Sequence, residues 1–325
     1  MGHLGAGVAV VIAAYKSEDS IARAVRTALL QREVTELLVV VDGSPDATAS
    51  QARALDDHSG RLRVIECPER RGPSAARNLG IARSSAPWIA ILDADDYMEE
   101  GRFDRLLRCT ADYDFVADDL WVVEEGDKHG SPYAMASDGG FEVPQTLTFE
   151  NFVLGNIPAK PYHDLGYLKP VMSRAFLDSR RLTYDESMRL GEDYDLYARA
   201  LLAGARFRLL PPLGYISVRH KDSLSHQHGI EDLRRLREAD DRLLSSCRLS
   251  YAERRALKRH RQHVNQRYQW RCLIEAIKVG NSAQAASCFL SDGRTTIGLV
   301  GLLWTAFCNR VSRKERLEVD ELSVQ

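Results

Sequence analysis

The first hundred residues alternate short apolar runs with stretches of helical periodicity, and this alternation limits the folds open to the chain. Apolar runs cover Val8–Ala14, Leu37–Val41, Leu62–Ile65 and Trp88–Leu92, and the apolar residues of 21–29 recur with helical spacing. Runs that are apolar throughout are typical of strands buried on both faces of a parallel sheet. The sequence therefore predicts an α/β fold, with a mostly parallel central sheet flanked by helices.

Beyond residue 114 the pattern is more mixed. A helix is predicted over Glu192–Ala203, followed by strands over Phe207–Leu210 and Tyr215–Arg219. The polar, glycine-containing stretch Glu125–Gly140 predicts a mobile loop.

The composition changes after residue 226. Residues Ile230–Gly280 contain almost no glycine or proline and show helical periodicity. We therefore expect two parts: an α/β domain over residues 1–226 and a helical C-terminal region over residues 227–325.

The helical region combines basic charge with one apolar run. Between Arg248 and Arg271 there are eight Lys or Arg residues against a single acid, Glu253, and Ile297–Cys308 is a run of twelve uncharged residues. Twelve residues are too few to span a membrane, which takes about 20. We expect this region either to lie on an anionic membrane surface without crossing it, or to pack on the α/β domain.

The overall composition argues against several classes of protein. With 44 basic and 46 acidic residues, the net charge of -2 gives no global argument for a nucleic-acid partner. Six cysteines without a C-x-x-C pair predict neither a zinc site nor a disulfide framework. Residues Met1–Gly7 lack the basic segment of a signal peptide. We expect a cytoplasmic protein with reduced thiols.

Three carboxylates follow the apolar strand predicted at Trp88–Leu92, namely Asp93, Asp95 and Asp96. Ligands of open α/β sheets bind at such carboxyl ends of strands. Carboxylates this close repel one another unless a cation compensates them, and oxygen ligands suit a divalent metal ion with a diphosphate. The pattern predicts such a site, and the alternative is a capped turn that leads into a helix.

Other polar residues stand at the ends of predicted elements. Asp42 ends the second strand in V-D-G-S-x-D-x-T, and Arg77 lies in the turn-and-helix segment R-G-x-x-x-A-R-N-x-G. Asp193 begins a helix in G-E-D, where the dipole favours carboxylates. Arg219 and His220 end the last strand. Each segment alone also has a structural explanation as a turn, a helix start or a solvated loop.

In this order and spacing, the motifs V-D-G-S-x-D-x-T, R-G-x-x-x-A-R-N-x-G, D-A-D-D and G-E-D resemble those of the inverting glycosyltransferases of family 2. The resemblance runs from Val8 to Ser225. It implies the GT-A (nucleotide-diphospho-sugar transferase) fold, with the catalytic domain in residues 1–226. It also implies six donor-binding residues: Ala14, Tyr15, Asp42, Arg77, Asp93 and Arg219.

The same resemblance implies individual roles. Asp42 and Arg77 are expected to hold the nucleotide base, and Asp93 to reach the ribose or the sugar. Asp95, completed by His220, is expected to bind Mn²⁺ or Mg²⁺ on the diphosphate.

The reaction that the resemblance implies is a metal-dependent hexosyl transfer. A nucleotide-diphosphate donor, most often a UDP-sugar, gives its sugar to an acceptor hydroxyl that Asp193 deprotonates. The resemblance is to non-processive enzymes that extend a glycan or a lipid-linked glycan for an exopolysaccharide or surface glycan. We therefore expect a cytoplasmic enzyme, peripheral on the inner membrane face, with no nucleic-acid partner.

Three competing hypotheses make distinct predictions. A Rossmann-type dehydrogenase or methyltransferase, or a sugar nucleotidyltransferase, requires a glycine-rich turn after the first strand, but residues 13–17 contain no glycine. A degenerate GT-A scaffold or binding protein would keep the fold without releasing nucleoside diphosphate. The presence of Asp95 and Asp193 argues against that hypothesis.

Overall fold

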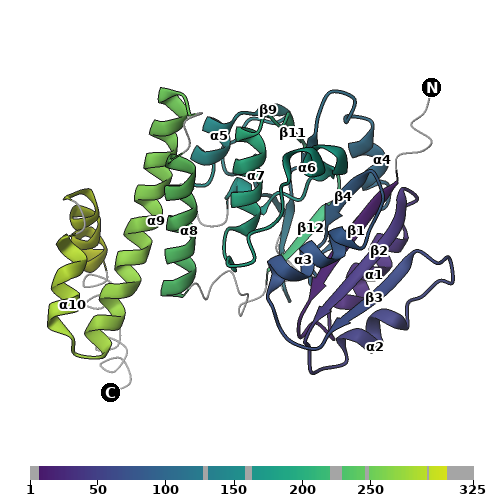
Figure 1. Cartoon of the computed structure of the whole chain (residues 1–325), viewed down its shortest axis with the longest axis horizontal. Helices are drawn as coiled ribbons and strands as arrows, with labels where there is room; N and C mark the ends of the chain where they lie inside the picture. The colour runs from purple at the N-terminus through teal and green to yellow at the C-terminus, as the bar shows by residue number, and fades with distance from the viewer. Residues whose placement is uncertain are drawn as a thin grey trace, which may run out of the picture.

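The α/β part lies at one end of the molecule and α10 (Ser282–Ser287) lies at the other (Figure 1). Helices α8 (Ile230–Leu244) and α9 (Tyr251–Lys278) stand upright between them. The computed structural model describes residues 7–126, 131–157, 163–219, 229–245, 249–290 and 293–305.

Four parallel strands form the first half of the main sheet, in the order β3-β2-β1-β4. This confirms the alternation predicted from the apolar runs. Strands β1, β2 and β4 are mostly buried because both faces are covered by helices, whereas β3 is partly exposed at the edge of the sheet. Their bounds are β1 Val8–Ala14, β2 Val34–Asp42, β3 Leu62–Cys67 and β4 Trp88–Ile91. The connecting helices are α1 Ile21–Leu29, α2 Thr48–Arg53 and α3 Pro73–Ala82.

Two glycines bring α3 close to the sheet. Gly72 precedes the helix with φ +100°, a conformation that residues with a side chain rarely adopt. A Cβ on Gly80 would lie 2.4 Å from a methyl carbon of Val11 in β1. The close contact fixes α3 against β1.

The second half of the main sheet is mixed rather than parallel, with the order β4-β10-β6-β11-β9. Strand β10 (Val171–Ser173) runs antiparallel to both neighbours, pairing Val171 with Ala90 of β4 and with Val116 of β6. Because β10 runs in reverse, its first residue lies at the edge where β4 ends. The other strands are β6 Phe115–Asp118, β9 Gln145–Leu147 and β11 Phe207–Leu210.

A smaller sheet has the order β5-β12-β7-β8. Within the expected loop over residues 125–140, the described part is packed instead. Its strand β8 pairs with β7, residues 134–136 are buried, and Asp119 accepts the N–H of Ala136 at 2.6 Å. Residues 127–130 lie outside the described part. The bounds are β5 Tyr97–Met98, β7 Trp121–Glu124, β8 Tyr133–Ala134 and β12 Tyr215–Arg219.

The upright helices α8 and α9 share the hydrophobic core of the α/β part. Leu236 and Leu243 of α8, and Leu257 and Val264 of α9, belong to the same buried cluster as the sheet. Helix α9 packs on α5, and α8 packs on α7. Helix α7 coincides with the helix predicted over Glu192–Ala203. The remaining elements of this part are α4 Arg102–Leu107, α5 Phe149–Leu154, the short helix η1 Leu165–Tyr167, α6 Arg174–Arg180 and α7 Glu192–Leu202.

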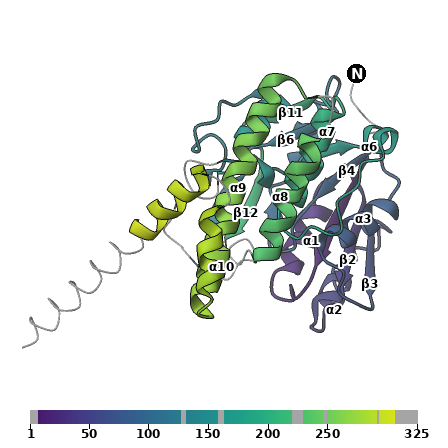
Figure 2. The same cartoon turned by 60° about the vertical axis from the view of Figure 1, so that its left-hand side comes forward.

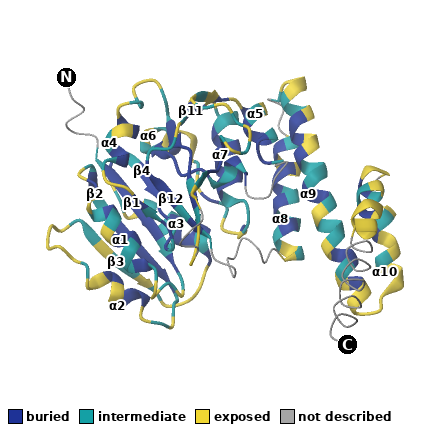
Figure 3. Ribbon diagram, turned by 180° about the vertical axis from the view of Figure 1, so that it is seen from behind, coloured by how far each residue is buried: buried dark blue, intermediate teal, exposed yellow. Residues whose placement is uncertain are grey.

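The last helical segments lie beyond α9, away from the sheet (Figure 2). They are α10 (Ser282–Ser287), η3 (Cys288–Leu290) and a helix over residues 293–305. Leu299 is buried beside α9, whereas Ile297 is 75% exposed, in a region with much exposed surface (Figure 3). None of the described helices is both long and apolar enough to cross a membrane. Free thiols are found at each described cysteine: Cys67, Cys109, Cys272 and Cys288.

A fully buried ion pair joins α4 to the two sheets. Arg102 donates to Asp118 at 2.7 and 2.9 Å and to the carbonyl of Lys169 at 2.6 Å. Asp118 also accepts the N–H of Leu213 at 3.0 Å. The pair thereby connects the end of β6 to the residue that precedes Pro170 and β10.

We predict that Arg102→Met lowers the free energy of unfolding by about 3–5 kcal/mol, because it leaves the Asp118 charge buried without its partner. The matched control is Arg108→Met, since Arg108 pairs with Asp104 on the exposed face of the same helix. That control is expected to change stability by less than about 1 kcal/mol. Urea unfolding followed by circular dichroism measures both, and equal losses would contradict the prediction.

Candidate active site

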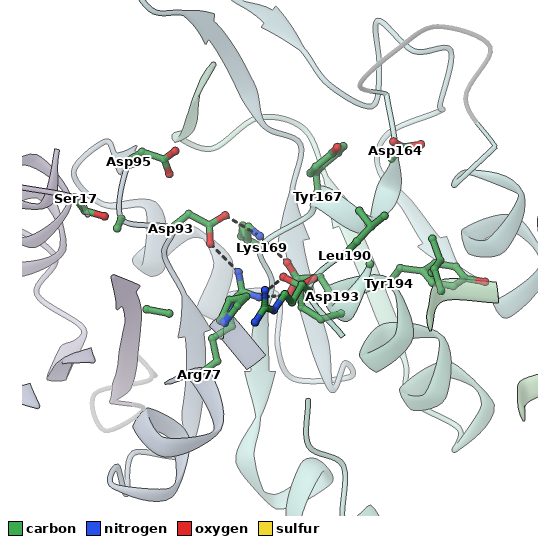
Figure 4. Close-up of a pocket in the computed structure, with 18 of the residues that line it drawn as sticks. Ser17, Arg77, Asp93, Asp95, Asp164, Tyr167, Lys169, Leu190, Asp193 and Tyr194 are labelled. Carbon is green, nitrogen blue, oxygen red and sulfur yellow. Dashed lines mark hydrogen bonds and ion pairs between the residues drawn. The ribbon is translucent and has the colours of Figure 1, made fainter. Parts of the chain in front are cut away.

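A cavity of about 1010 Å³ opens at the edge where the parallel strands end. One side is formed by the loops after β1 and β4, which contribute Lys16 and Asp95. The other side is formed by α7, α8 and α9, with Leu236 and His260 among its residues. The cavity thus lies between the α/β part and the upright helices, and Figure 4 shows the side chains at its centre.

Two buried cations and three carboxylates meet at the centre of this cavity. Lys169 Nζ lies 3.0 Å from Asp93 Oδ2 and 2.7 Å from Asp193 Oδ2 (Figure 4). Arg77 donates to Asp93 Oδ1 at 2.9 Å and to Glu192 Oε1 at 2.6 Å. We call these five residues the central ion network. It joins α3, the end of β4, the start of β10 and α7.

In the central ion network, neighbouring opposite charges shift the pKa values of Asp93 and Lys169 more strongly than burial does. Burial alone would raise the pKa of Asp93, but the positive charges of Lys169 and Arg77 hold it well below its usual range. Burial alone would lower the pKa of Lys169, but the carboxylates of Asp193 and Asp93 raise it above its ordinary value. Lys169 and Asp93 are therefore both charged at neutral pH.

Asp193 is the second residue of α7, after Gly191, whose φ of +70° suits the tight turn into the helix. Lys169 donates to its Oδ2. Its buried Oδ1 has no hydrogen-bond partner among the described residues, and Arg77 Nη1 is 3.7 Å from it. The side chain therefore has one oxygen held by a lysine and one with unused capacity to accept a proton.

The carboxylates that follow β4 have different surroundings. Asp96 is buried and accepts from the Tyr215 hydroxyl and the Val218 N–H, both at 2.8 Å. Burial, together with the charges of Asp95 and Asp93, raises the pKa of Asp96. Asp95 lines the cavity instead, beside Asp93 (Figure 4). Asp95 is thus the carboxylate of the triplet that a ligand reaches without displacing an ion pair of the central ion network.

The donor set around Asp95 fits a divalent cation that is shared with a substrate. Mg²⁺ commonly takes one or two protein carboxylates and completes its shell with phosphate oxygens and water. In the described ranges, no group of three or more His, Cys, Asp or Glu side chains is arranged to hold a metal ion. His220, the second expected ligand, lies outside the described residues. The residues present fit a metal that the diphosphate helps to bind.

Asp42 lies apart from the central ion network. Its carboxylate accepts the N–H groups of Arg71 at 2.8 Å and Gly72 at 2.7 Å, which ties the end of β2 to the start of α3. It is buried and does not line the cavity. Arg77, the other residue expected at the nucleotide base, points into the network instead.

The remaining expected donor residues also lie outside the cavity wall. Ala14 is buried at the end of β1, and the Tyr15 ring stacks under the guanidinium of Arg70 at 3.8 Å. Arg219 ends β12 and approaches Glu124 to 3.9 Å. Of the nine expected site residues, the structure brings together four in one cavity: Arg77, Asp93, Asp95 and Asp193.

Lys169 is the central residue that sequence reasoning missed. Its only sequence signature is a lone charge directly before the apolar run of β10. A charged residue at such a position is usually read as solvated. Here it is 4% exposed, because the antiparallel direction of β10 carries its start to the edge beside Asp93.

Comparison with known proteins identifies the family. The sequence profile of Glycosyl transferase family 2 matches residues 9–171. The succinoglycan biosynthesis protein ExoU of Rhizobium meliloti (strain 1021) is 43% identical over 273 residues, which cover 82% of this chain and 78% of that protein. The succinoglycan biosynthesis protein ExoO of the same organism is 34% identical over 288 residues, 88% of this chain and 81% of that protein.

Solved structures support the fold. TarS 1-349 of S. aureus in complex with UDP-GlcNAc is 16% identical with a TM-score of 0.62, covering 87% of this chain and 90% of that one. The mannosyltransferase PcManGT from Pyrobaculum calidifontis, in complex with GDP-Man and Mn²⁺, is 15% identical with a TM-score of 0.57, covering 94% and 80%. From the family match and this shared architecture, we conclude that the chain belongs to glycosyltransferase family 2 and has the GT-A fold.

Proposed function

We propose that this glycosyltransferase binds a nucleoside diphosphate sugar, in first place a UDP-sugar. It transfers the sugar with inversion to an acceptor hydroxyl beside Asp193. The observation that carries the proposal is that Asp95 and Asp193 line one cavity from different elements, with Asp93 and Lys169 between them. The TarS complex with UDP-GlcNAc supports a UDP-sugar in this fold.

Inverting transfer requires a base on one side of the anomeric carbon and charge stabilisation on the other. Asp193 would take the proton of the acceptor hydroxyl at Oδ1, while Lys169 holds Oδ2. Arg77 and Lys169 would hold Asp93 toward the donor. In this proposal Arg77 acts by positioning the carboxylates.

The donor would lie along the edge formed by the loops after β1 and β4. Asp42, Ala14 and Tyr15 are proposed to shape the end that takes the nucleotide base, and Arg219 the diphosphate end. Asp95, with His220, would hold Mn²⁺ or Mg²⁺, which when bound neutralises the charge of the leaving diphosphate. The Mn²⁺ in the PcManGT complex supports a divalent ion in this fold.

The biological acceptor is proposed to be a lipid-linked glycan that the enzyme extends during the synthesis of an exopolysaccharide. ExoU and ExoO, which are similar to this chain over most of its length, are succinoglycan biosynthesis proteins, and this supports the assignment. In this proposal residues 1–226 carry the donor chemistry, and residues 227–325 complete the cavity and face the membrane.

The C-terminal helices are proposed to rest on the anionic inner face of a membrane. The helix over 293–305 buries Thr295 and Leu299 against α9 but exposes Ile297, Val300 and Trp304 at 75%, 55% and 68%. Exposed basic residues of α9 add attraction to anionic headgroups: Arg255, Lys258, Arg259, Arg267 and Arg271. Binding to the membrane surface in this way would bring a lipid-linked acceptor close to the cavity.

We predict that Asp95→Ala abolishes sugar transfer and removes the metal-dependent part of UDP binding, because the diphosphate then lacks its bridging ion. Calorimetric titration of UDP with and without Mn²⁺ measures this, and Asp112→Ala, at an exposed carboxylate outside the cavity wall, is the control. Full activity of the wild-type enzyme after EDTA treatment would contradict the metal assignment.

Asp193→Asn is expected to lower kcat by about 10²–10⁴-fold, the usual contribution of a general base. Asparagine keeps the shape and one hydrogen bond to Lys169 but cannot take a proton, so donor KM should change far less than kcat. Steady-state release of UDP in the presence of acceptor measures both constants. Asp178→Asn, at an exposed site on α6, is the control, and near wild-type turnover of Asp193→Asn would refute the base.

The membrane proposal predicts that replacing Ile297, Val300 and Trp304 together by Glu abolishes co-sedimentation with phosphatidylglycerol vesicles, because it reverses the charge of the apolar face. The control is Leu30→Glu, since Leu30 is a 54% exposed apolar residue on the α/β part. Equal sedimentation of the triple variant and the wild type would rule the proposal out, as would no sedimentation of the wild type.

A further inference from the structure

The cavity continues past Asp193 into a part that the transfer step does not use. There it is lined by Asp164 and Tyr167 beside η1, by Tyr194 of α7 and by His260 of α9. Figure 4 shows Asp164 and Tyr194 farther from Asp95 than Asp193 is, with Tyr167 between Asp95 and Asp164. We call these four residues the distal wall.

His260 is held in one orientation by a buried carboxylate. Its Nδ1 lies 2.8 Å from Asp240 Oδ2, and Asp240 Oδ1 accepts the Tyr194 hydroxyl at 2.9 Å. Asp240 is fully buried and His260 is 3% exposed, with its ring stacked on Tyr194 at 4.4 Å between centroids. With Nδ1 committed to Asp240, Nε2 is the ring nitrogen left for a ligand, and no described residue hydrogen-bonds to it.

Asp164 is a second polar group with unused hydrogen-bonding capacity. Its carboxylate makes no hydrogen bond to the described residues, although Arg267, His260 and Arg219 lie close enough for their charges to act on it. Burial raises the pKa of Asp164 to about 6, against the opposing effect of the Arg267 and Arg219 charges and of the neighbouring His260. At neutral pH the distal wall therefore presents a carboxylate beside an imidazole.

We propose that the distal wall is the subsite for an uncharged sugar residue of the acceptor, an inference that rests on the proposed function. A sugar ring offers hydroxyl groups that both donate and accept, with apolar C–H faces between them. Asp164 accepts from one hydroxyl, His260 Nε2 bonds to another, and the ring of Tyr167 packs on the C–H face. Arg267 of α9 lines the same cavity and lies close enough to balance the Asp164 charge, so no unpaired positive charge is left to favour a carboxylate or phosphate on the sugar.

Packing of the helices alone does not account for this arrangement. The Asp240 carboxylate already joins α7, α8 and α9 through Tyr194 and His260. Asp164 takes no part in that link, yet its carboxylate stands in the cavity wall without a hydrogen bond. Asp164 is partly buried, and a carboxylate that receives no hydrogen bond from the described residues gains one when a ligand hydroxyl donates to it.

The test is saturation-transfer NMR with methyl β-D-glucopyranoside and methyl β-D-glucuronide as probes, on the full chain saturated with UDP and Mn²⁺. We expect the neutral glycoside to bind more tightly than the charged one. Asp164→Ala and His260→Phe should each weaken its binding by about fivefold to twentyfold, the effect of losing one or two hydrogen bonds. The controls are Asp178→Asn and His263→Gln, because His263 lies one turn along α9 and outside the cavity wall.

Asp164→Ala keeps the test decisive even where His260→Phe disturbs the buried Asp240. The subsite is overturned when the neutral glycoside shows no saturation transfer, when the glucuronide binds more tightly, or when Asp164→Ala binds as the wild type does. Titration of UDP into the same samples distinguishes a failure of the proposed function from a failure of the sugar subsite. Failure to bind UDP refutes the proposed function, whereas UDP binding without glycoside binding refutes only the subsite.

Discussion

Neutralisation of buried charge at the carboxyl edge of the sheet is the constraint on which the site depends. Asp93, Glu192 and Asp193 come from segments about a hundred residues apart in sequence, and their mutual repulsion in a buried place would separate them. Arg77 and Lys169 lie between them at 2.6–3.0 Å. Removing either cation would leave uncompensated buried charge, which is far more costly than losing a surface ion pair.

The same network divides the cavity into two halves with different chemistry. On the side of Asp95 the wall combines carboxylates with Lys16 and Arg23, which suits a metal ion and a diphosphate. On the side of the upright helices the wall combines aromatic rings with Asp164, His260 and Arg267, which suits hydroxyl groups. Asp193 stands at the boundary, where an acceptor hydroxyl and a donor sugar would meet. Helices α8 and α9 are therefore part of the site as well as part of the core.

Local sequence was sufficient for the elements that bury apolar residues. The runs that became β1, β4 and the second half of β2 are apolar at nearly every position, so only a sheet covered on both faces can bury them. The placement of Asp93 and Asp95 at the end of β4 followed directly, since residues after a parallel strand lie at its carboxyl edge. The direction of β10 was not predictable, because its three residues carry no pattern that distinguishes parallel from antiparallel pairing.

By itself, then, the sequence determined the alternation of strands and helices, the acidic end of β4, the helix that begins at Glu192 and the helical C-terminal region, because periodicity and end residues are local properties. The tertiary structure decided which charges meet. The antiparallel direction of β10 places Lys169 between Asp93 and Asp193. The backbone N–H groups of Arg71 and Gly72 donate to Asp42, and the packing of α7, α8 and α9 places His260 beside Asp240. Each of these contacts joins residues at least twenty positions apart, and pairings at that distance depend on the packing of the whole core.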